Sequence, residues 1–139
     1  MRFVLILSAA LAFGACSQQP ASETPAPEAA TVAEVDAELA TVSTPANGAR
    51  VTSPLLVSGV APANWYFENQ FPVRLLDANG AEIAAAPAHP RVSWTDPGPK
   101  EFDAELTFST RGPATLVLEE DMPSEGNEPR QVRIPVVLE

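Results

Sequence analysis

The stretch EFDAELTF, residues 101–108, alternates between apolar and polar side chains without a break. A period of two places alternate residues on opposite faces of an extended chain. One face would carry the apolar residues Phe102, Ala104, Leu106 and Phe108, and the other face Asp103, Glu105 and Thr107. The stretch therefore predicts a β-strand that covers a hydrophobic core with one face and meets water with the other.

Shorter segments on both sides repeat this pattern. Twelve of the fifteen prolines fall within residues 42–139, at spacings that leave no room for a helix of ordinary length. The turn signal Asp77-Ala78-Asn79-Gly80 joins two of the segments in an expected hairpin, and Pro135 marks an edge or a bulge in the last one. We expect further strands at 50–52 with 54–59, 71–76, 82–85, 114–119 and 132–138.

About seven short strands without a disulfide favour an all-β fold, an immunoglobulin-like β-sandwich. A small open barrel is the alternative. The domain is expected to span residues 42–139. Residues 16–41 precede it as an acidic, proline-containing segment with few large apolar residues, and they predict a disordered tether. Within the tether, Val32, Val35 and Leu39 have helical spacing and predict a transient helical turn.

The N-terminus reads as an export signal. Met1-Arg2 is followed by an apolar run from Phe3 to Phe13 and then by Gly14-Ala15-Cys16. This arrangement resembles a bacterial lipoprotein lipobox. The resemblance implies that residues 1–15 are a signal peptide and that the Cys16 sulfur carries acyl chains such as palmitate, which anchor the protein to a membrane. The apolar run is too short for a transmembrane helix, which needs about 20 residues.

The net charge of the chain and the residue after Cys16 limit where the protein is located and what it can bind. The net charge of −10 excludes nucleic-acid binding, which needs basic clusters, and leaves the lipid as the contact with the membrane. Ser17 follows Cys16, where an Asp would be the retention signal for the inner membrane in enteric bacteria. By that analogy we expect the outer membrane, with the protein facing the periplasm.

The folded part resembles one known family. The segments that carry the resemblance are TPANGARVTSPLLVSGVA (44–61), WYFENQFPVRLLDANGAEI (65–83), a lone Trp94, FDAELTFST (102–110), ATLVLEEDMPSEG (114–126) and VRIPVVL (132–138). Together they are similar to the immunoglobulin-like domain of bacterial spore germination proteins, the Gmad family. The resemblance implies an immunoglobulin-like fold in an extracytoplasmic setting. It implies no reaction, and it does not imply a role in germination, because members also occur as lipoproteins in bacteria without spores.

The resemblance draws attention to the loop at Asp121-Met122-Pro123-Ser124, where members often have Asp-Asn-Pro-Ser-Gly. Met122 in place of Asn removes an amide that could donate and accept hydrogen bonds. We take Asp121, Pro123 and Ser124 as candidate binding residues, together with Trp94.

An aromatic cluster, Trp65-Tyr66-Phe67-Glu68, supplies the other candidates. In a strand, Trp65 and Phe67 would share the core face, with Glu68 in water or paired to Arg74. In the alternative, Trp65 or Tyr66 is exposed and stacks on a glycan or a peptide. The acidic run at Glu119-Glu120-Asp121 predicts a solvated loop, since the sequence pattern of a calcium loop is missing.

The chain carries no recognisable catalytic or metal-binding pattern. Its one histidine, His89, sits in a proline-flanked segment expected to be a loop, and one histidine with one lipidated cysteine cannot form a transition-metal site. No serine has the context of a nucleophile elbow. We therefore expect no cofactor and no enzymatic activity. The prediction is a lipid-anchored envelope protein whose domain mediates protein–protein interaction, with glycan or peptidoglycan binding through the aromatic cluster as the alternative.

Overall fold

The computed structural model describes residues 39–139, and Cys16, the signal peptide and the 31–38 part of the expected helical turn lie outside the described residues. The described chain forms eight strands and one short 3₁₀ helix. These are β1 (Thr41–Thr44), β2 (Arg50–Val51), β3 (Leu55–Ala61), η1 (Ala63–Trp65), β4 (Phe71–Asp77), β5 (Glu82–Pro90), β6 (Lys100–Leu106), β7 (Gly112–Glu119) and β8 (Gln131–Leu138).

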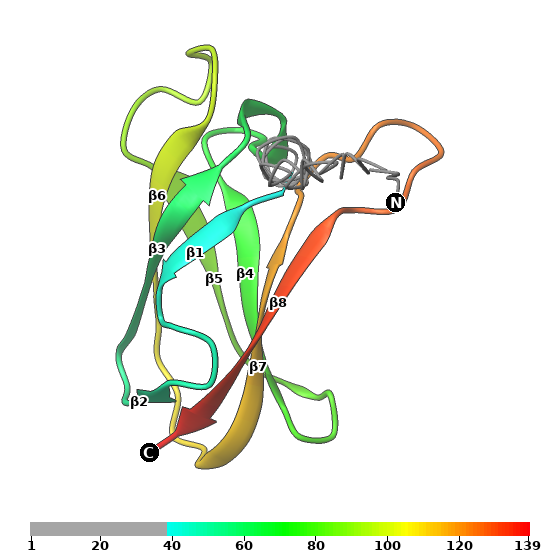
Figure 1. Cartoon of the computed structure of the whole chain (residues 1–139). Coiled ribbons are helices and arrows are strands. Elements are labelled where there is room, and N and C mark those ends of the chain that lie inside the picture. The colour runs from blue at the N-terminus through cyan, green and yellow to red at the C-terminus, as the bar shows by residue number, and fades with distance from the viewer. Residues whose placement is uncertain (1–38) are drawn as a thin grey trace, which may run out of the picture.

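The strands form one curled sheet in the order β1-β3-β6-β5-β4-β7-β8-β2. Strand β5 connects the two halves of the sheet, because it pairs with a strand of each half. Its first part pairs with β4, and its end at His89 and Pro90 pairs with β6. The two halves therefore face each other across a core, as in an immunoglobulin-like sandwich (Figure 1). The predicted all-β class is confirmed.

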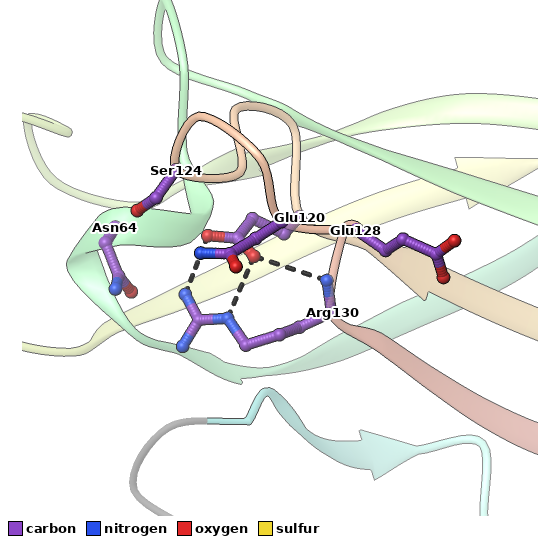
Figure 2. A pocket seen from close by; sticks show the side chains of 6 residues that line it. Asn64, Glu120, Ser124, Glu128 and Arg130 are labelled. Carbon is purple, nitrogen blue, oxygen red and sulfur yellow. Dashed lines mark hydrogen bonds and ion pairs between the residues drawn. The ribbon is translucent and has the colours of Figure 1, made fainter.

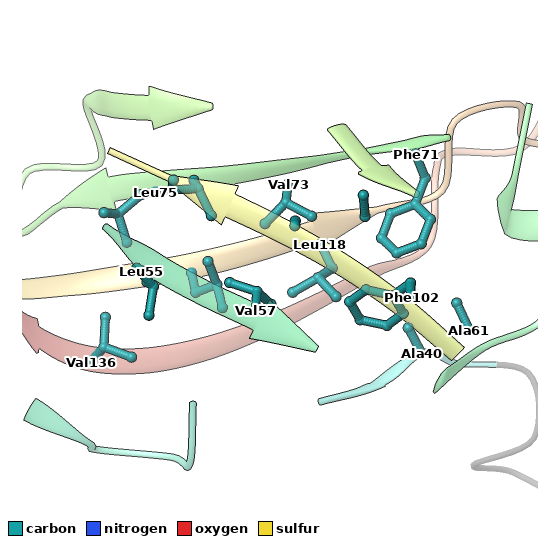
Figure 3. Close-up of a cluster of buried hydrophobic side chains, with 14 of the residues drawn as sticks. Ala40, Leu55, Val57, Ala61, Phe71, Val73, Leu75, Phe102, Leu118 and Val136 are labelled. Carbon is teal, nitrogen blue, oxygen red and sulfur yellow. The ribbon is translucent and has the colours of Figure 1, made fainter. Parts of the chain in front are cut away.

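The alternation in residues 101–108 is confirmed residue by residue. Phe102, Ala104, Leu106 and Phe108 are buried, whereas Asp103, Glu105 and Thr107 are exposed. The buried side chains of β6 meet those of β3 and β4 between the two halves of the sheet (Figure 3). Phe102 lies at the centre, with its ring edge-on to the ring of Phe71 at 5.0 Å.

Gly59 in β3 lies where the backbone of β1 and the ring of Phe102 leave no room for a side chain. A Cβ at this position would lie 1.9 Å from the Thr41 carbonyl oxygen and 3.0 Å from the Phe102 ring. We expect Gly59→Ala to lower the free energy of unfolding by about 2 kcal/mol, because β1 must move away from β3. Urea unfolding measures the change, with Ser58→Ala in the same strand as control. A loss below about 0.5 kcal/mol would contradict this packing.

The hairpin predicted from the turn at residues 77–80 and the edge predicted from Pro135 are both present. The Asp77 carboxylate accepts hydrogen bonds from the amides of Asn79 (2.8 Å) and Ala81 (3.0 Å) and so shapes the β4–β5 turn. Pro135 lies in β8 opposite Thr115, and its carbonyl accepts a hydrogen bond from the amide of Gly48 (2.7 Å). Strand β2 reaches β8 only at Val137 and Leu138, so β8 is an edge strand at the proline.

Two boundaries differ from the expected ones. Ala40 is buried and Thr41 opens β1, so residues that were expected in the tether belong to the folded domain. Strand β5 runs to Pro90, and the prediction of a loop around His89 was wrong. Pro87 is tolerated because it faces Pro72, a position at which neither nitrogen has a hydrogen to donate, and Pro90 is the last residue of the strand. Within residues 39–139 no helix is long and apolar enough to cross a membrane.

Candidate functional site

Three loops meet at one end of the sandwich, which we call the loop end. They are the β3–β4 loop (62–70), the β5–β6 loop (91–99) and the β7–β8 loop (120–130). Figure 1 shows all three at the end opposite the C-terminus. Thr41 pairs with Val60 near the end of β3, so the chain also enters the domain here. Loops at one end of such a sandwich can vary without disturbing the core, which makes them the usual place for binding.

The β3–β4 loop is not the strand that the aromatic cluster predicts. Pro62 accepts a hydrogen bond from the amide of Trp65 (3.1 Å) and closes the 3₁₀ turn η1. Phe67 and Gln70 then pair with each other, and Glu68 and Asn69 between them have positive φ angles of 50° and 69°. Positive φ at both central residues is the geometry of a tight type I′ turn.

This geometry reverses part of the expected burial pattern. Trp65 is fully buried, as expected for a core residue, and Tyr66 beside it is buried as well. Phe67, which was expected in the core, is 38% exposed at the tip of the turn. The alternative of an exposed Trp65 or Tyr66 platform therefore does not fit the structure, and Phe67 takes the exposed position.

Contacts among the loops bind them into one surface. The Tyr66 hydroxyl donates a hydrogen bond to the carbonyl of Lys100 (3.1 Å), and burial raises the pKa of this hydroxyl, so it remains a donor. The Asp121 amide donates to the carbonyl of Trp65 (3.2 Å). The ring of Phe67 lies edge-on to Trp94 at 6.5 Å, which joins the β3–β4 and β5–β6 loops.

The β5–β6 loop is closed by a buried lysine. Lys100 is 2% exposed, and its Nζ donates hydrogen bonds to the carbonyls of Asp96 and Gly98, the second at 2.8 Å. A buried ammonium group is tolerated when its hydrogens are satisfied in this way. The loop that carries Trp94 is therefore held from inside the domain.

An ion pair at the base of the β7–β8 loop was not anticipated. Glu120 is buried, and its carboxylate accepts two hydrogen bonds from the Arg130 guanidinium, at 2.8 and 2.7 Å, and one from the Arg130 amide at 3.2 Å. These bonds hold the pKa of Glu120 below its usual value. The prediction of a solvated acidic loop was therefore wrong for Glu120. This ion pair was hard to predict from the sequence. The loop between Glu120 and Arg130 contains two further glutamates, and nothing in the sequence shows which glutamate pairs with the arginine.

The same arginine connects two loops. The Arg130 guanidinium lies 5.9 Å from the centre of the Trp65 ring, a cation–π distance. The ion pair forms part of the wall of a polar pocket of about 420 Å³, together with Asn64, Ser124, Asn127 and Glu128. Figure 2 shows Asn64 and Ser124 on one side of this pocket and Glu128 turned away on the other.

The candidate residues from the sequence fall into two places. At the loop end, Glu68 and Ser124 are exposed, and Trp94, Asp121 and Pro123 are half-buried. Arg74 lies instead on the outer face of β4, where it pairs with Glu82 (3.6 Å) and Glu119 (3.5 Å). Glu68 was expected in water or paired to Arg74, and the structure shows it exposed and not paired to Arg74. Met122, which was not predicted as a binding residue, is 57% exposed in the same loop as Asp121.

Comparison with known proteins gives one match. The family model described as the immunoglobulin-like domain of bacterial spore germination (Gmad2) matches residues 39–127. The chain belongs to this family. The Gmad2 match contains all three loops up to Asn127, whereas β8 with its VRIPVVL sequence lies beyond it. No curated protein and no solved structure matches the chain.

Membership in the Gmad2 family suggests a non-catalytic domain for protein interaction. The loop end is chemically consistent with this role, because it presents apolar and acidic side chains on a fixed backbone. Within residues 39–139 no three His, Cys, Asp or Glu side chains come together to hold a metal ion.

Proposed function

We propose that the protein is a lipid-anchored envelope protein whose Gmad2 domain binds another envelope protein through the loop end. The lipobox-like sequence at Cys16 supports the anchor, and Ser17 supports the outer membrane with the domain in the periplasm. The family supports an interaction domain.

The observation that carries the proposal is a pair of large, exposed apolar side chains. They lie on loops whose backbones are held in place by contacts with the rest of the domain. Phe67 is 38% exposed and Met122 is 57% exposed at the same end of the domain. Exposed apolar groups on a rigid backbone bind without a large ordering cost, and aromatic residues often dominate the energy of protein interfaces. The rest of the loop end supplies a polar rim.

The excess of acidic side chains on the loops indicates the kind of partner. The loops carry Glu68, Asp96, Asp121, Glu125 and Glu128, while their arginines, Arg91 and Arg130, already form ion pairs within the domain. Complementary charge favours a partner with a basic surface.

Phe67→Ser should lower the recovery of the partner at least about ten-fold, which corresponds to about 1.4 kcal/mol of binding energy. The measurement is chemical cross-linking of the full lipoprotein in its own cells, followed by purification and mass spectrometry. Leu56→Ser is the matched control, because Leu56 is 61% exposed near the start of β3, away from the loop end.

One protein that is lost with Phe67→Ser and kept with Leu56→Ser would support the proposal. Equal recovery with both variants would overturn it. Cross-links only to peptidoglycan, removed by a muramidase, would favour the glycan alternative, in which the contacting rings are the exposed Phe67 and the half-buried Trp94 and not Trp65.

A further inference from the structure

A second recess lies beside the loop end, on the outer face of β4 and β5. It is a groove of about 330 Å³, lined by Gln70, Pro72, Ala85, Pro87 and Asp121, with Phe71, Val73 and Ala86 completing its walls. The groove is thus mostly apolar along its length. Among residues 39–139, the one charged group on its wall is the carboxylate of Asp121 in the β7–β8 loop.

The apolar part of the groove is rigid. Pro72 and Pro87 face each other across the β4–β5 pair, and Arg74 faces Ala85 two pairs further from the loop end, on the same side of the sheet. Proline rings have fixed backbone angles, so this surface loses no conformational freedom when it is covered. The small side chain of Ala85 leaves room beside the two rings.

The Asp121 carboxylate has no basic partner among residues 39–139. No hydrogen bond or ion pair joins it to an arginine or lysine of the described chain, and Arg74 on the same face is engaged with Glu82 and Glu119. Burial raises the pKa of Asp121, and the charges of Glu68 and Glu119 raise it further. A half-buried carboxylate with two acidic neighbours lacks a cation that would stabilise it.

We propose that this groove receives a lysine or arginine side chain of the protein partner, with its aliphatic stem on Pro72 and Pro87 and its charged head on Asp121. Long basic side chains cover apolar surface with their stems and keep the charge at the tip, which matches an apolar groove with an acidic end. The hydrogen bonds to Asp121 would be charge-assisted and therefore strong. The inference rests on the proposed function, because it names the chemistry of that partner.

Blocked tripeptides test the groove without a known partner. The full chain, labelled with ¹⁵N, is titrated with Gly-Arg-Gly, with Gly-Lys-Gly, and with Gly-citrulline-Gly, in which the side chain has the shape of arginine but no charge. We expect saturable shifts of the amide signals of Gln70, Ala86 and Asp121 with the two basic peptides only. Asp121→Asn should weaken this binding at least ten-fold. Glu125→Gln, an exposed carboxylate of the same loop that does not line the groove, should leave it unchanged.

The melting temperature of each variant shows whether it remains folded. The folded domain disfavours the ionised form of the Asp121 carboxyl group. Asp121→Asn removes this charge, so the melting temperature of the variant should rise or stay constant. Equal shifts with the citrulline peptide, or no saturable shift at these amides, would overturn the inference. The proposed function fails separately, if Phe67→Ser does not change the cross-linked partner while the basic peptides still bind.

Discussion

Arg130→Ala should lower the free energy of unfolding by about 4 kcal/mol, because it leaves a buried carboxylate without its counter-ion. In the native domain Glu120 is 6% exposed, and its carboxylate accepts hydrogen bonds from the guanidinium and the backbone amide of Arg130. The substitution leaves only the bond from the residue 130 amide and also removes the cation–π contact with Trp65. Urea unfolding followed by circular dichroism measures the loss.

The acid dependence of stability should change sign in the same variant. The folded pKa of Glu120 lies below its ordinary value of 4.5, so its contribution is present above about pH 4.5 and is lost as the pH falls through the folded value. Without Arg130, burial should raise the pKa of Glu120 instead. The variant should then recover stability relative to the wild type as the pH falls below about 5, because protonation removes the buried charge.

A second substitution controls for simple loss of packing. Adding Glu120→Gln to Arg130→Ala removes the orphaned charge and should restore a substantial part of the lost stability. If the double variant is no more stable than Arg130→Ala alone, the effect comes from lost packing around Arg130. That result would contradict the importance of the ion pair.

Trp65→Ala should cost about 4 kcal/mol of folding stability, the range seen when a large buried aromatic side chain is removed. The Trp65 side chain is fully buried and lies edge-on to Phe71 at 5.8 Å, and its carbonyl holds the β7–β8 loop at Asp121. Unfolding in urea should show the loss. Small domains have total stabilities of about 5–15 kcal/mol, so the variant should also be sensitive to heat.

Phe67→Ala is the matched control, since it removes an aromatic side chain two residues away that is 38% exposed. Its expected cost is about 1 kcal/mol or less. The contrast between the two variants separates a residue that supports the loop end from one that is displayed on it. Equal costs would show that the burial assigned to Trp65 is incorrect.

Much of the fold could be predicted from local patterns. The alternation in 101–108 gives the buried and exposed faces of β6, because a strand has a period of two whatever its neighbours are. Asp77 and Gly80 mark the hairpin through hydrogen bonds and backbone angles within the turn itself. Pro135 marks an edge because it lacks an amide hydrogen. Each of these signals acts within a few residues.

The candidate site was predicted in part. Trp65, Phe67, Trp94 and Asp121 were singled out one by one, and the tertiary structure brings them together on the three loops of the loop end. Their burial was assigned incorrectly in part, because the expected strand at 65–68 is a 3₁₀ turn followed by a tight reversal. That reversal turns Tyr66 inward and Phe67 outward.

The sequence by itself determined the class of the fold, the positions of most strands and the acidic character of the chain. Only the tertiary structure decided that Tyr66 bonds to Lys100, that Glu120 is neutralised by Arg130, and that Asp121 lies at an apolar groove with no basic partner among residues 39–139. The physical reason is the distance along the chain over which each interaction acts. Strand and turn propensities depend on neighbours along the chain, whereas burial and ion pairing depend on which loops the sandwich brings together.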